Sequence, residues 1–356
     1  MMRSRHSEKI ASPKAKLVLE DKTVIDGLSF GFSGSTAGEV VFNTGMVGYP
    51  EALTDPSYAG QILVLTYPMI GNYGVPNITT LESGRIHLAG LVVAEYSAAY
   101  HHHSAVYSLA DWLKRERIPA ITGVDTRAIT RRLREQGVML GKLIAGAPIT
   151  RFVDPNTRNL VADVSVKKPR TYGSGEKRVI AVDCGIKENS IRMFMRRGVS
   201  VLRVPWDYDF LNEPFGGIFL SNGPGDPVMC GETIRNIRRA MERGVPIFGI
   251  CLGNQLLGLA AGGKTYKLKY GHRSQNQPVV EQGTRRGFIT SQNHGYALDG
   301  ASLPREWRVW FENGNDGTVE GIRHARRPWF AVQFHPEAAP GPTDTEWLFD
   351  EFVSLL

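Results

Sequence analysis

The first half of the chain carries short apolar segments, rich in β-branched residues and separated by turns that contain glycine, proline or asparagine. Such segments are typical of β-strands. They lie at 16–20, 23–27, 40–42, 61–66 and 86–94. Two helices are expected among them, because Ser108 and Asp125 stand as N-caps before apolar residues at helical spacing, and Gly137 ends the second helix. This half is therefore predicted to be an α+β domain made mostly of strands.

The pattern changes at residue 178 to apolar strands that alternate with amphipathic helices. Strands are expected at 179–183, 199–204, 217–220 and 245–250, and helices at 186–197 and 232–243. Alternation of this kind predicts a doubly wound, mainly parallel α/β sheet with helices on both faces. Functional residues in such sheets lie beyond the carboxyl ends of the strands.

The stretch between these halves is typical of a linker. Pro148 and Pro155 interrupt any helix, and 167–178 is polar, basic and glycine-bearing. The α/β protein is thus divided into an N-terminal domain at 1–146, a linker at 147–177 and a C-terminal α/β domain at 178–356.

The composition is ordinary for a globular protein, with 42% hydrophobic and 22% charged residues. No run of 18 apolar residues occurs, and the polar opening at 1–9 lacks the apolar core of a signal peptide. Cysteines 184, 230 and 251 form no disulfide framework, so a cytoplasmic protein is expected. The net charge of +7 is spread over helix faces. The side chains of histidines 101–103 point to alternate sides of an extended segment, so they are not expected to bind one metal together. We therefore expect that the protein binds no nucleic acid, membrane or metal.

A candidate nucleophile stands in the sequence Gly249-Ile-Cys251-Leu-Gly253, between an apolar strand and a helix. Gly-x-Cys-x-Gly in this setting is the cysteine version of the nucleophile elbow, in which the glycines permit a sharp turn. The N-terminus of the following helix carries a partial positive charge that favours the reactive thiolate. A buried structural cysteine is the alternative that this motif alone leaves open.

Two further stretches supply partners for this cysteine. His335-Pro-Glu337 follows an apolar strand, and the proline restricts the backbone so that the two side chains are held in one geometry. A cysteine nucleophile needs a base, and the base needs an orienting carboxylate. The glycine-rich turn Gly223-Pro-Gly225 also follows a strand and can expose backbone N–H groups to an oxyanion.

Together these motifs resemble a known family. The elbow, Ser221-Asn-Gly-Pro-Gly-Asp-Pro227, Ser291-Gln-Asn-His-Gly-Tyr296 and the His-Pro-Glu turn are similar to a class I (triad-type) glutamine amidotransferase domain. In the first half, Gly38-Glu-Val-Val-Phe-Asn-Thr44 and Leu53-Thr-Asp-Pro-Ser-Tyr58 resemble the small, glutamine-hydrolysing subunit of carbamoyl-phosphate synthetase. The resemblance covers almost the whole chain.

The resemblance implies a glutaminase with a catalytic triad of Cys251, His335 and Glu337. The cysteine would form a γ-glutamyl thioester that water hydrolyses, and ammonia would pass through a tunnel to a large subunit. Glutamine-binding residues carried over from the family are Ser57, Gly223, Gly225, Leu252, Gln255, Asn293, Gly295 and Tyr296. The chain has no nucleotide-binding motif, so ATP and Mg²⁺ are expected on the large subunit and no cofactor on this chain. The product would supply pyrimidine and arginine biosynthesis.

The partner implied is the carbamoyl-phosphate synthetase large subunit, in a heterodimer or a higher oligomer. An amidotransferase of another synthetase is one alternative, which the Leu-Thr-Asp-Pro-Ser-Tyr motif argues against. A regulatory module of the same fold is another, which the intact Cys–His–Glu set argues against. Asn254 departs from the family, in which His is common at this position. Its side chain is expected near the thiolate and near any partner surface that covers the cleft.

Overall fold

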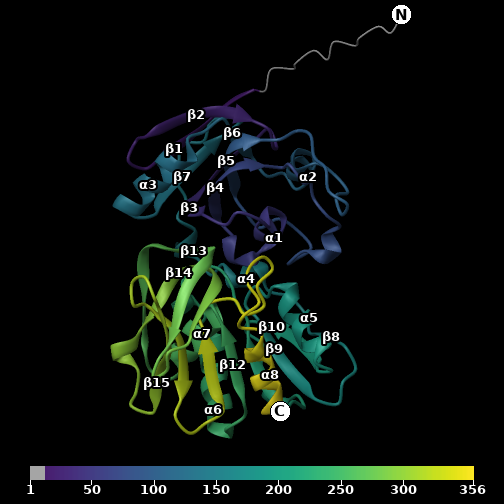
Figure 1. The fold of residues 1–356 in the computed structure, drawn as a ribbon, viewed down its shortest axis with the longest axis vertical. Coiled ribbons are helices and arrows are strands. Elements are labelled where there is room, and N and C mark those ends of the chain that lie inside the picture. Colours follow the sequence, from purple (N-terminus) through teal and green to yellow (C-terminus); the bar gives the residue numbers. More distant parts are fainter. Residues whose placement is uncertain (1–12) are drawn as a thin grey trace, which may run out of the picture.

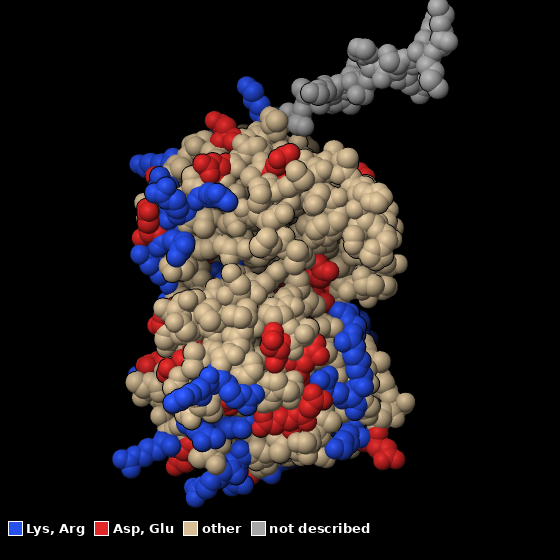
Figure 2. Space-filling view, viewed as in Figure 1, with Lys and Arg blue, Asp and Glu red and all other residues tan. Residues whose placement is uncertain are grey.

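The computed structural model of the protein describes residues 13–356 and has two domains arranged along its long axis (Figure 1). The polar opening at 1–9, expected to lack a signal-peptide core, lies outside the described residues. Within the part of the chain that is described, no helix is long and apolar enough to cross a membrane. The space-filling view narrows where the two domains meet (Figure 2), and on the face shown basic and acidic side chains mix over the second domain.

The N-terminal domain is built on a closed barrel of seven strands. These are β1 (Lys14–Leu19), β2 (Val24–Ser29), β3 (Ser35–Asn43), β4 (Gln61–Ile70), β5 (Gly90–Tyr96), β6 (Ala120–Thr122) and β7 (Met139–Ile144), in the order β1-β2-β6-β5-β4-β3-β7. Strands β3 to β6 pair in parallel, and the other pairs are antiparallel. Alternate residues of β4, such as Ile62 and Leu63, belong to two different apolar clusters, as the two faces of a strand require.

The short helices of this domain lie against the barrel. They are α1 (Tyr49–Thr54), η1 (Pro56–Tyr58), η2 (Ile78–Thr80), α2 (Leu109–Arg115) and α3 (Thr126–Gln136). Both predicted N-caps are confirmed. The Ser108 hydroxyl accepts the Asp111 N–H at 3.1 Å, and the Asp125 carboxylate accepts the Ala128 N–H at 2.9 Å. Gly137, at φ 102°, ends α3 as expected.

The stretch expected as a linker carries short elements of its own. These are η3 (Pro155–Thr157), α4 (Val161–Val164) and β8 (Arg170–Tyr172). Strand β8 pairs antiparallel with a strand of the second domain. Leu160, just before α4, is buried, and its side chain lies beside Gly60 of the first domain and Gly225 of the second. This stretch therefore contacts both domains as it crosses between them.

The centre of the second domain is a parallel sheet, as predicted. Its strands are β9 (Arg178–Asp183), β10 (Ser200–Pro205), β11 (Gly217–Leu220), β12 (Ile247–Ile250) and β17 (Trp329–Val332), in the order β17-β12-β11-β9-β10. Helices α5 (Glu188–Arg196) and α8 (Trp347–Ser354) share one apolar cluster with alternate strand residues. Helices α6 (Gly231–Arg243) and α7 (Leu252–Ala260) share the other. The sheet is therefore covered on both faces.

An antiparallel half, which the sequence did not reveal, extends this sheet beyond β17. It comprises β13 (Lys264–Glu281), β14 (Gly287–Asp299), β15 (Trp307–Asn313) and β16 (Val319–His324). The long β13–β14 hairpin reaches the barrel (Figure 1). There the Val138 N–H donates to Lys269 O at 2.9 Å, and the Thr44 N–H donates to Arg273 O at 3.2 Å. The hairpin thus carries Asn293 and its neighbours to the boundary between the domains.

Candidate active site

Cys251 occupies a strained turn between β12 and α7. Its φ of 54° and ψ of −103° lie outside the regions that most residues adopt, and its N–H donates to Val332 O at 2.8 Å. A Cβ on Gly249 or Gly253 would collide with backbone atoms, so glycine at both positions permits the turn. The cysteine is only 2% exposed and lies just past the end of its strand. This geometry matches the predicted elbow.

His335 and Glu337 form a buried pair beside this turn. The imidazole Nδ1 lies 2.7 Å from Glu337 Oε1, and both residues are almost fully buried. The His335 N–H donates to Ser291 O at 2.9 Å, which ties the turn to β14. Among the described residues, Nε2 of His335 has no hydrogen-bond partner. Because Nδ1 is held by the carboxylate, Nε2 is the nitrogen left for the thiol.

Each group of the His335–Glu337 pair stabilises the charged form of the other. Burial alone would lower the pKa of His335, but the Glu337 carboxylate and Cys251 raise it from 6.5 to about 10. Burial would raise the pKa of Glu337, yet the charges of His335 and Lys187 hold it below its usual value. The arrangement therefore stabilises an imidazolium, the form that His335 takes once it has accepted a proton, beside the Glu337 carboxylate.

The thiol of Cys251 points to another partner in this structure. Its Sγ lies 3.7 Å from Asn293 O, within the range of a weak S–H hydrogen bond. Catalytic hydrogen bonds are often long or poorly aligned without substrate and tighten in the complex. The two observations describe a resting thiol held by β14, with the Nε2 of His335 available.

The glycine-rich turn after β11 packs directly against the start of α7. A Cβ on Gly223 would collide with Cys184 O and lie 2.8 Å from a methyl group of Leu252. Gly225 has a φ of 84°, which glycine adopts without strain. The turn and the first N–H groups of α7 thus lie side by side, where both can face an oxyanion.

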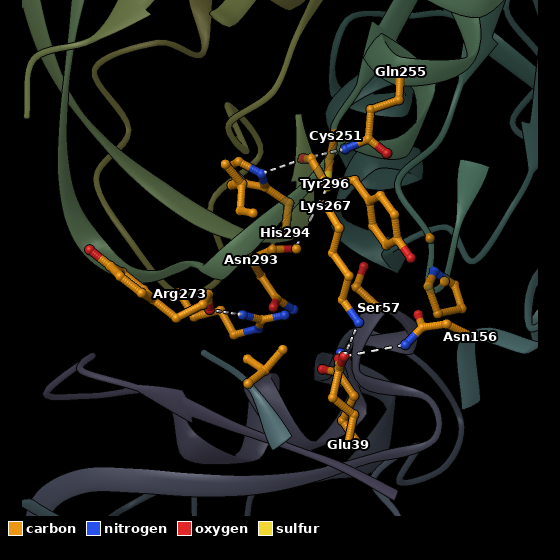
Figure 3. A pocket seen from close by; sticks show the side chains of 18 residues that line it. Glu39, Ser57, Asn156, Cys251, Gln255, Lys267, Arg273, Asn293, His294 and Tyr296 are labelled. Atoms are coloured by element: carbon orange, nitrogen blue, oxygen red, sulfur yellow. Dashed lines mark hydrogen bonds and ion pairs between the residues drawn. The ribbon is translucent and has the colours of Figure 1, made fainter. Parts of the chain in front are cut away.

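One cavity contains Cys251 and most of the predicted glutamine-binding residues (Figure 3). Those that line it are Ser57, Gly223, Gly225, Gln255, Asn293, Gly295 and Tyr296. Leu252, the eighth, is buried beneath the turn and does not line the cavity. The residues come from both domains, with Ser57 from the first, so the cavity lies at the domain boundary.

Gln255 and Asn254 are both tied to Gln333. The Gln255 amide donates to Tyr296 O at 2.8 Å and to Gln333 Oε1 at 3.1 Å, and the Asn254 amide donates to the same Oε1 at 3.2 Å. Asn254 is fully buried. The expectation that its side chain lies near a partner surface is therefore wrong, because this helix position faces the interior of the domain.

Asp55 was not among the site residues predicted from the sequence, although it stands in the Leu-Thr-Asp-Pro-Ser-Tyr motif. Asp55 Oδ2 accepts a hydrogen bond from Asn293 at 2.9 Å, and Oδ1 accepts the Ser57 N–H at 2.9 Å. The side-chain amide of Asn222, next to the oxyanion turn, donates to the Ser57 hydroxyl at 3.0 Å. The usable signal was the Asp-Pro-Ser spacing, in which the aspartate caps a short helix.

Charged residues of the same cavity were also missed. Glu39 Oε1 lies 2.6 Å from Lys267 Nζ and accepts a hydrogen bond from Asn156 at 3.2 Å, which joins the barrel, the linker and β13 (Figure 3). Arg273 is buried and donates to Tyr270 O at 2.7 Å. Its Nε has no partner within the described residues, and burial lowers its pKa. The cavity therefore contains a buried cation without a carboxylate in hydrogen-bond contact.

Three buried residues near this cavity could geometrically hold a metal ion. The ligand atoms of His272, His294 and Glu320 lie within 4.8 Å of one another. They are, however, engaged in protein contacts: His294 Nδ1 lies 2.8 Å from Tyr296 O, and His272 Nδ1 lies 3.3 Å from Glu320 Oε1. The pKa of His294 is held well below its usual value by burial, so this imidazole is neutral. The three side chains thus also hold β13, β14 and β16 together through their own contacts.

Comparisons with known proteins agree with this site. The family model "Carbamoyl-phosphate synthase small chain, CPSase domain" matches residues 17–143, and "Glutamine amidotransferase class-I" matches residues 180–355. Multifunctional protein CAD of Squalus acanthias is 52% identical in an alignment of 353 positions that covers 95% of this chain and 16% of that protein. The mitochondrial carbamoyl-phosphate synthase (ammonia) of Homo sapiens is 51% identical in an alignment of 369 positions that covers 99% of this chain and 24% of that protein.

Among solved structures, a glutamine amidotransferase of Thermotoga maritima is 20% identical, with a TM-score of 0.39 over 51% of this chain and 85% of that chain. The chain spans less than a quarter of the length of the two curated relatives above. Each of its two domains is matched by one of the two family models. The chain therefore belongs to the carbamoyl-phosphate synthase small-chain family, with a class-I glutamine amidotransferase domain.

Proposed function

We propose that the protein hydrolyses L-glutamine to glutamate and ammonia, and that the ammonia is used by a carbamoyl-phosphate synthase large chain. One observation carries this proposal. Cys251, at a strained elbow and beside a buried His335–Glu337 pair, shares a cavity with seven of the residues expected to bind glutamine. A cysteine, a base and an orienting carboxylate are the groups that acyl transfer from an amide requires.

The reaction begins when Cys251 Sγ attacks the side-chain amide carbon of glutamine. His335 Nε2 takes the thiol proton, and the C–N bond then breaks as the same nitrogen returns that proton to the leaving ammonia. Glu337 keeps the imidazole oriented through Nδ1. Water then adds to the γ-glutamyl thioester with His335 as the base, the C–S bond breaks, and glutamate and the thiol are formed.

The tetrahedral intermediates of both steps carry a negative oxygen. The N–H groups at the start of α7 and in the Gly223–Gly225 turn lie next to Cys251 and would donate to it. Removing one such donor typically costs about 2.7–4 kcal/mol of transition-state stabilisation. Because these donors are backbone groups fixed by tight glycine packing, little rearrangement is needed when the charge develops.

A second cavity beside His335 offers a path for ammonia. It is also lined by Lys187 and Asn293, and extends past Gly45 to Pro340. Cys251 lines the first cavity, His335 lines the second and Asn293 lines both. Met46 and Val47 also line this second cavity and are 68% and 61% exposed, which suits a surface that a partner covers.

The partner in this proposal is the large chain, which binds ATP and Mg²⁺, makes carbamoyl phosphate and assembles with this chain as a heterodimer or a higher oligomer. No cofactor is assigned to this chain. In the curated relatives the matched region is part of a much longer chain, so the same contact could also join two regions of one polypeptide. The product would enter pyrimidine and arginine biosynthesis, in the cytoplasm.

Substitution of Cys251 by Ser tests this function in the assembled complex. Glutamate release and glutamine-dependent carbamoyl phosphate synthesis should be lost, because a serine hydroxyl is far less acidic than a thiol. Ammonia-dependent synthesis should be unchanged. Cys230→Ser, at a buried cysteine of the opposite sheet face, is the matched control and should retain glutaminase activity. Wild-type rates of glutamate release from Cys251→Ser would overturn the proposal.

A further inference from the structure

A carboxylate of the first domain lies at the N-terminus of helix α5 in the second. Glu82, shortly after η2, is fully buried. Its backbone carbonyl accepts the Glu188 N–H at 2.9 Å, and its Oε2 accepts the Asn189 N–H at 3.1 Å. Oε1 lies 2.8 Å from Arg192 Nη2. One residue of the barrel domain therefore accepts two N–H groups of the first turn of α5, one with its backbone carbonyl and one with its side chain.

The same turn of α5 holds the loop that carries Glu337. The Asn189 side-chain amide donates to Glu337 O at 2.5 Å, and Lys187 Nζ donates to Ala338 O. Lys187 Nζ also lies 3.5 Å from Glu337 Oε1. Glu188 and Asn189 thus contact Glu82 through their backbone N–H groups, and the side chains of Lys187 and Asn189 contact the catalytic turn.

Lys187 and His335 compete for the same oxygen. Both contact Glu337 Oε1, the lysine at 3.5 Å and the imidazole at 2.7 Å, whereas Oε2 has no partner within residues 13–356. The ammonium of Lys187 is attracted by Glu82 and Asp55 as well as by Glu337. A negative Glu82 therefore shares the positive charge of the lysine and leaves Oε1 to the imidazole.

We propose that Glu82 is a positioning residue for the catalytic triad, acting across the domain boundary through Asn189 and Lys187. This inference rests on the proposed glutaminase function and deepens it, because it assigns the first domain a direct part in orienting His335. Two of the contacts that connect Glu82 to the triad are direct hydrogen bonds, from Asn189 to Glu82 and from Asn189 to Glu337. The link through Lys187 is electrostatic, and its effect is greatest where water is excluded.

The protonation of Glu82 should matter near neutral pH. Burial raises its pKa to about 7, although Lys187, Arg192 and the Asn189 N–H act in the opposite direction, and Glu337 adds to the rise. Below this pH the neutral carboxyl no longer shares the charge of Lys187. The lysine then interacts more strongly with Glu337, and the imidazole loses part of its orienting partner. Glutaminase activity should therefore fall as pH falls through about 7.

The test compares Glu82→Gln with the wild type in the assembled complex. We expect kcat for glutamine hydrolysis to fall roughly tenfold at pH 8 with KM changed less than about twofold, because glutamine itself does not contact this residue. The acidic limb of the kcat profile should be flattened, since the variant has no group to titrate. Glu82→Asp, which keeps the charge, should restore the limb in part.

Glu188→Gln is the matched control. Glu188 also stands in the first turn of α5 and is ion-paired, with Arg203 at 2.7 Å, but within residues 13–356 its side chain makes no hydrogen bond or ion pair with the Glu337 loop. Its substitution should leave the pH profile unchanged. Should Glu82→Gln not fold, Glu82→Asp decides, because its shorter side chain keeps the charge but draws it away from the Asn189 N–H. Its kcat should fall while an acidic limb remains, and an unchanged kcat would overturn the inference.

The outcomes separate this inference from the proposed function. If the wild type hydrolyses glutamine and Glu82→Gln does so with an unchanged kcat and acidic limb, Glu82 only holds the domains together and the inference is wrong. If the wild type releases no glutamate, the proposed function itself fails. Ammonia-dependent synthesis should not change in any of these variants, and a parallel loss would show a defect in assembly instead.

Discussion

Asp55 of the barrel domain accepts a 2.9 Å hydrogen bond from the side chain of Asn293, whose own carbonyl oxygen faces the thiol of Cys251 at 3.7 Å. A single residue, Asn293, therefore links the nucleophile to the first domain. Together with Ser57 in the cavity wall, this contact makes the active site a joint product of both domains. An amidotransferase domain separated from the barrel would lose these contacts without losing any member of its triad.

Substitution of Asp55 by Asn should reduce kcat/KM for glutamine by roughly tenfold to a hundredfold. The amide keeps the shape of the carboxylate, but a hydrogen bond to a charged group is worth about 1.5–3 kcal/mol. Steady-state glutaminase kinetics give the measurement. Asp125→Asn, at the N-cap of α3, is the control, because Asn caps a helix as well as Asp does. Equal kinetics for both variants would exclude a role for Asp55.

Glu337→Gln should change how stability depends on pH. In the wild type the folded pKa of His335, about 10, lies above its ordinary value of 6.5. Its contribution to the free energy of unfolding is therefore fully present below about pH 6.5 and is lost as pH rises towards 10. Without the carboxylate this loss should be smaller. Urea unfolding between pH 6 and 10 measures it, with Glu176→Gln, an exposed position, as the control.

Arg273→Met should separate stability from ligand binding. Because the guanidinium is buried without a carboxylate partner, its removal should leave the free energy of unfolding of the free protein unchanged or higher. We expect the cation to meet the α-carboxylate of the ligand, so the increase in Tm that L-glutamate produces should shrink or vanish. Thermal unfolding with and without L-glutamate is the measurement. Arg132→Met, at a partly exposed ion pair, should keep the full increase.

Restoring the family's histidine at position 254 should destabilise this protein. Asn254 is fully buried and already has one unpaired oxygen, so a larger imidazole would be overpacked at a cost of about 1–3 kcal/mol. Urea unfolding of Asn254→His measures the loss. Asn212→His, at an exposed position, should change the free energy of unfolding by no more than about 0.5 kcal/mol. A gain in stability at position 254 would show that the site has room for the ring.

The parts of the structure that could be predicted are those set by local chemistry. Caps at Ser108 and Asp125, the parallel strands of the second domain and the turn at Cys251 each depend on a few neighbouring residues. Barrel closure could not be predicted in the same way, because it depends on pairs such as Lys16 with Ile144, which are far apart in sequence. No local pattern encodes that register.

The same limit applies to the site. Cys251 and His335 stand in short motifs that the sequence displays, whereas Glu82 and Arg273 stand in none. Glu82 became visible only when the fold placed it beside α5, and Arg273 only when the β13–β14 hairpin reached the barrel. The hairpin itself was hidden because its residues alternate irregularly between buried and exposed, with register shifts along the pair.

The closed barrel restricts how a partner can recognise the first domain. Every strand of the closed ring has two neighbours, so within residues 13–356 this domain offers no strand that is unpaired along the whole of one side, as β-augmentation by an incoming chain favours. Such edge strands lie in the second domain, at β14 and at the three-residue β8. Recognition of the barrel must therefore depend on side chains and loops, where single substitutions can change specificity without disturbing a shared backbone ladder.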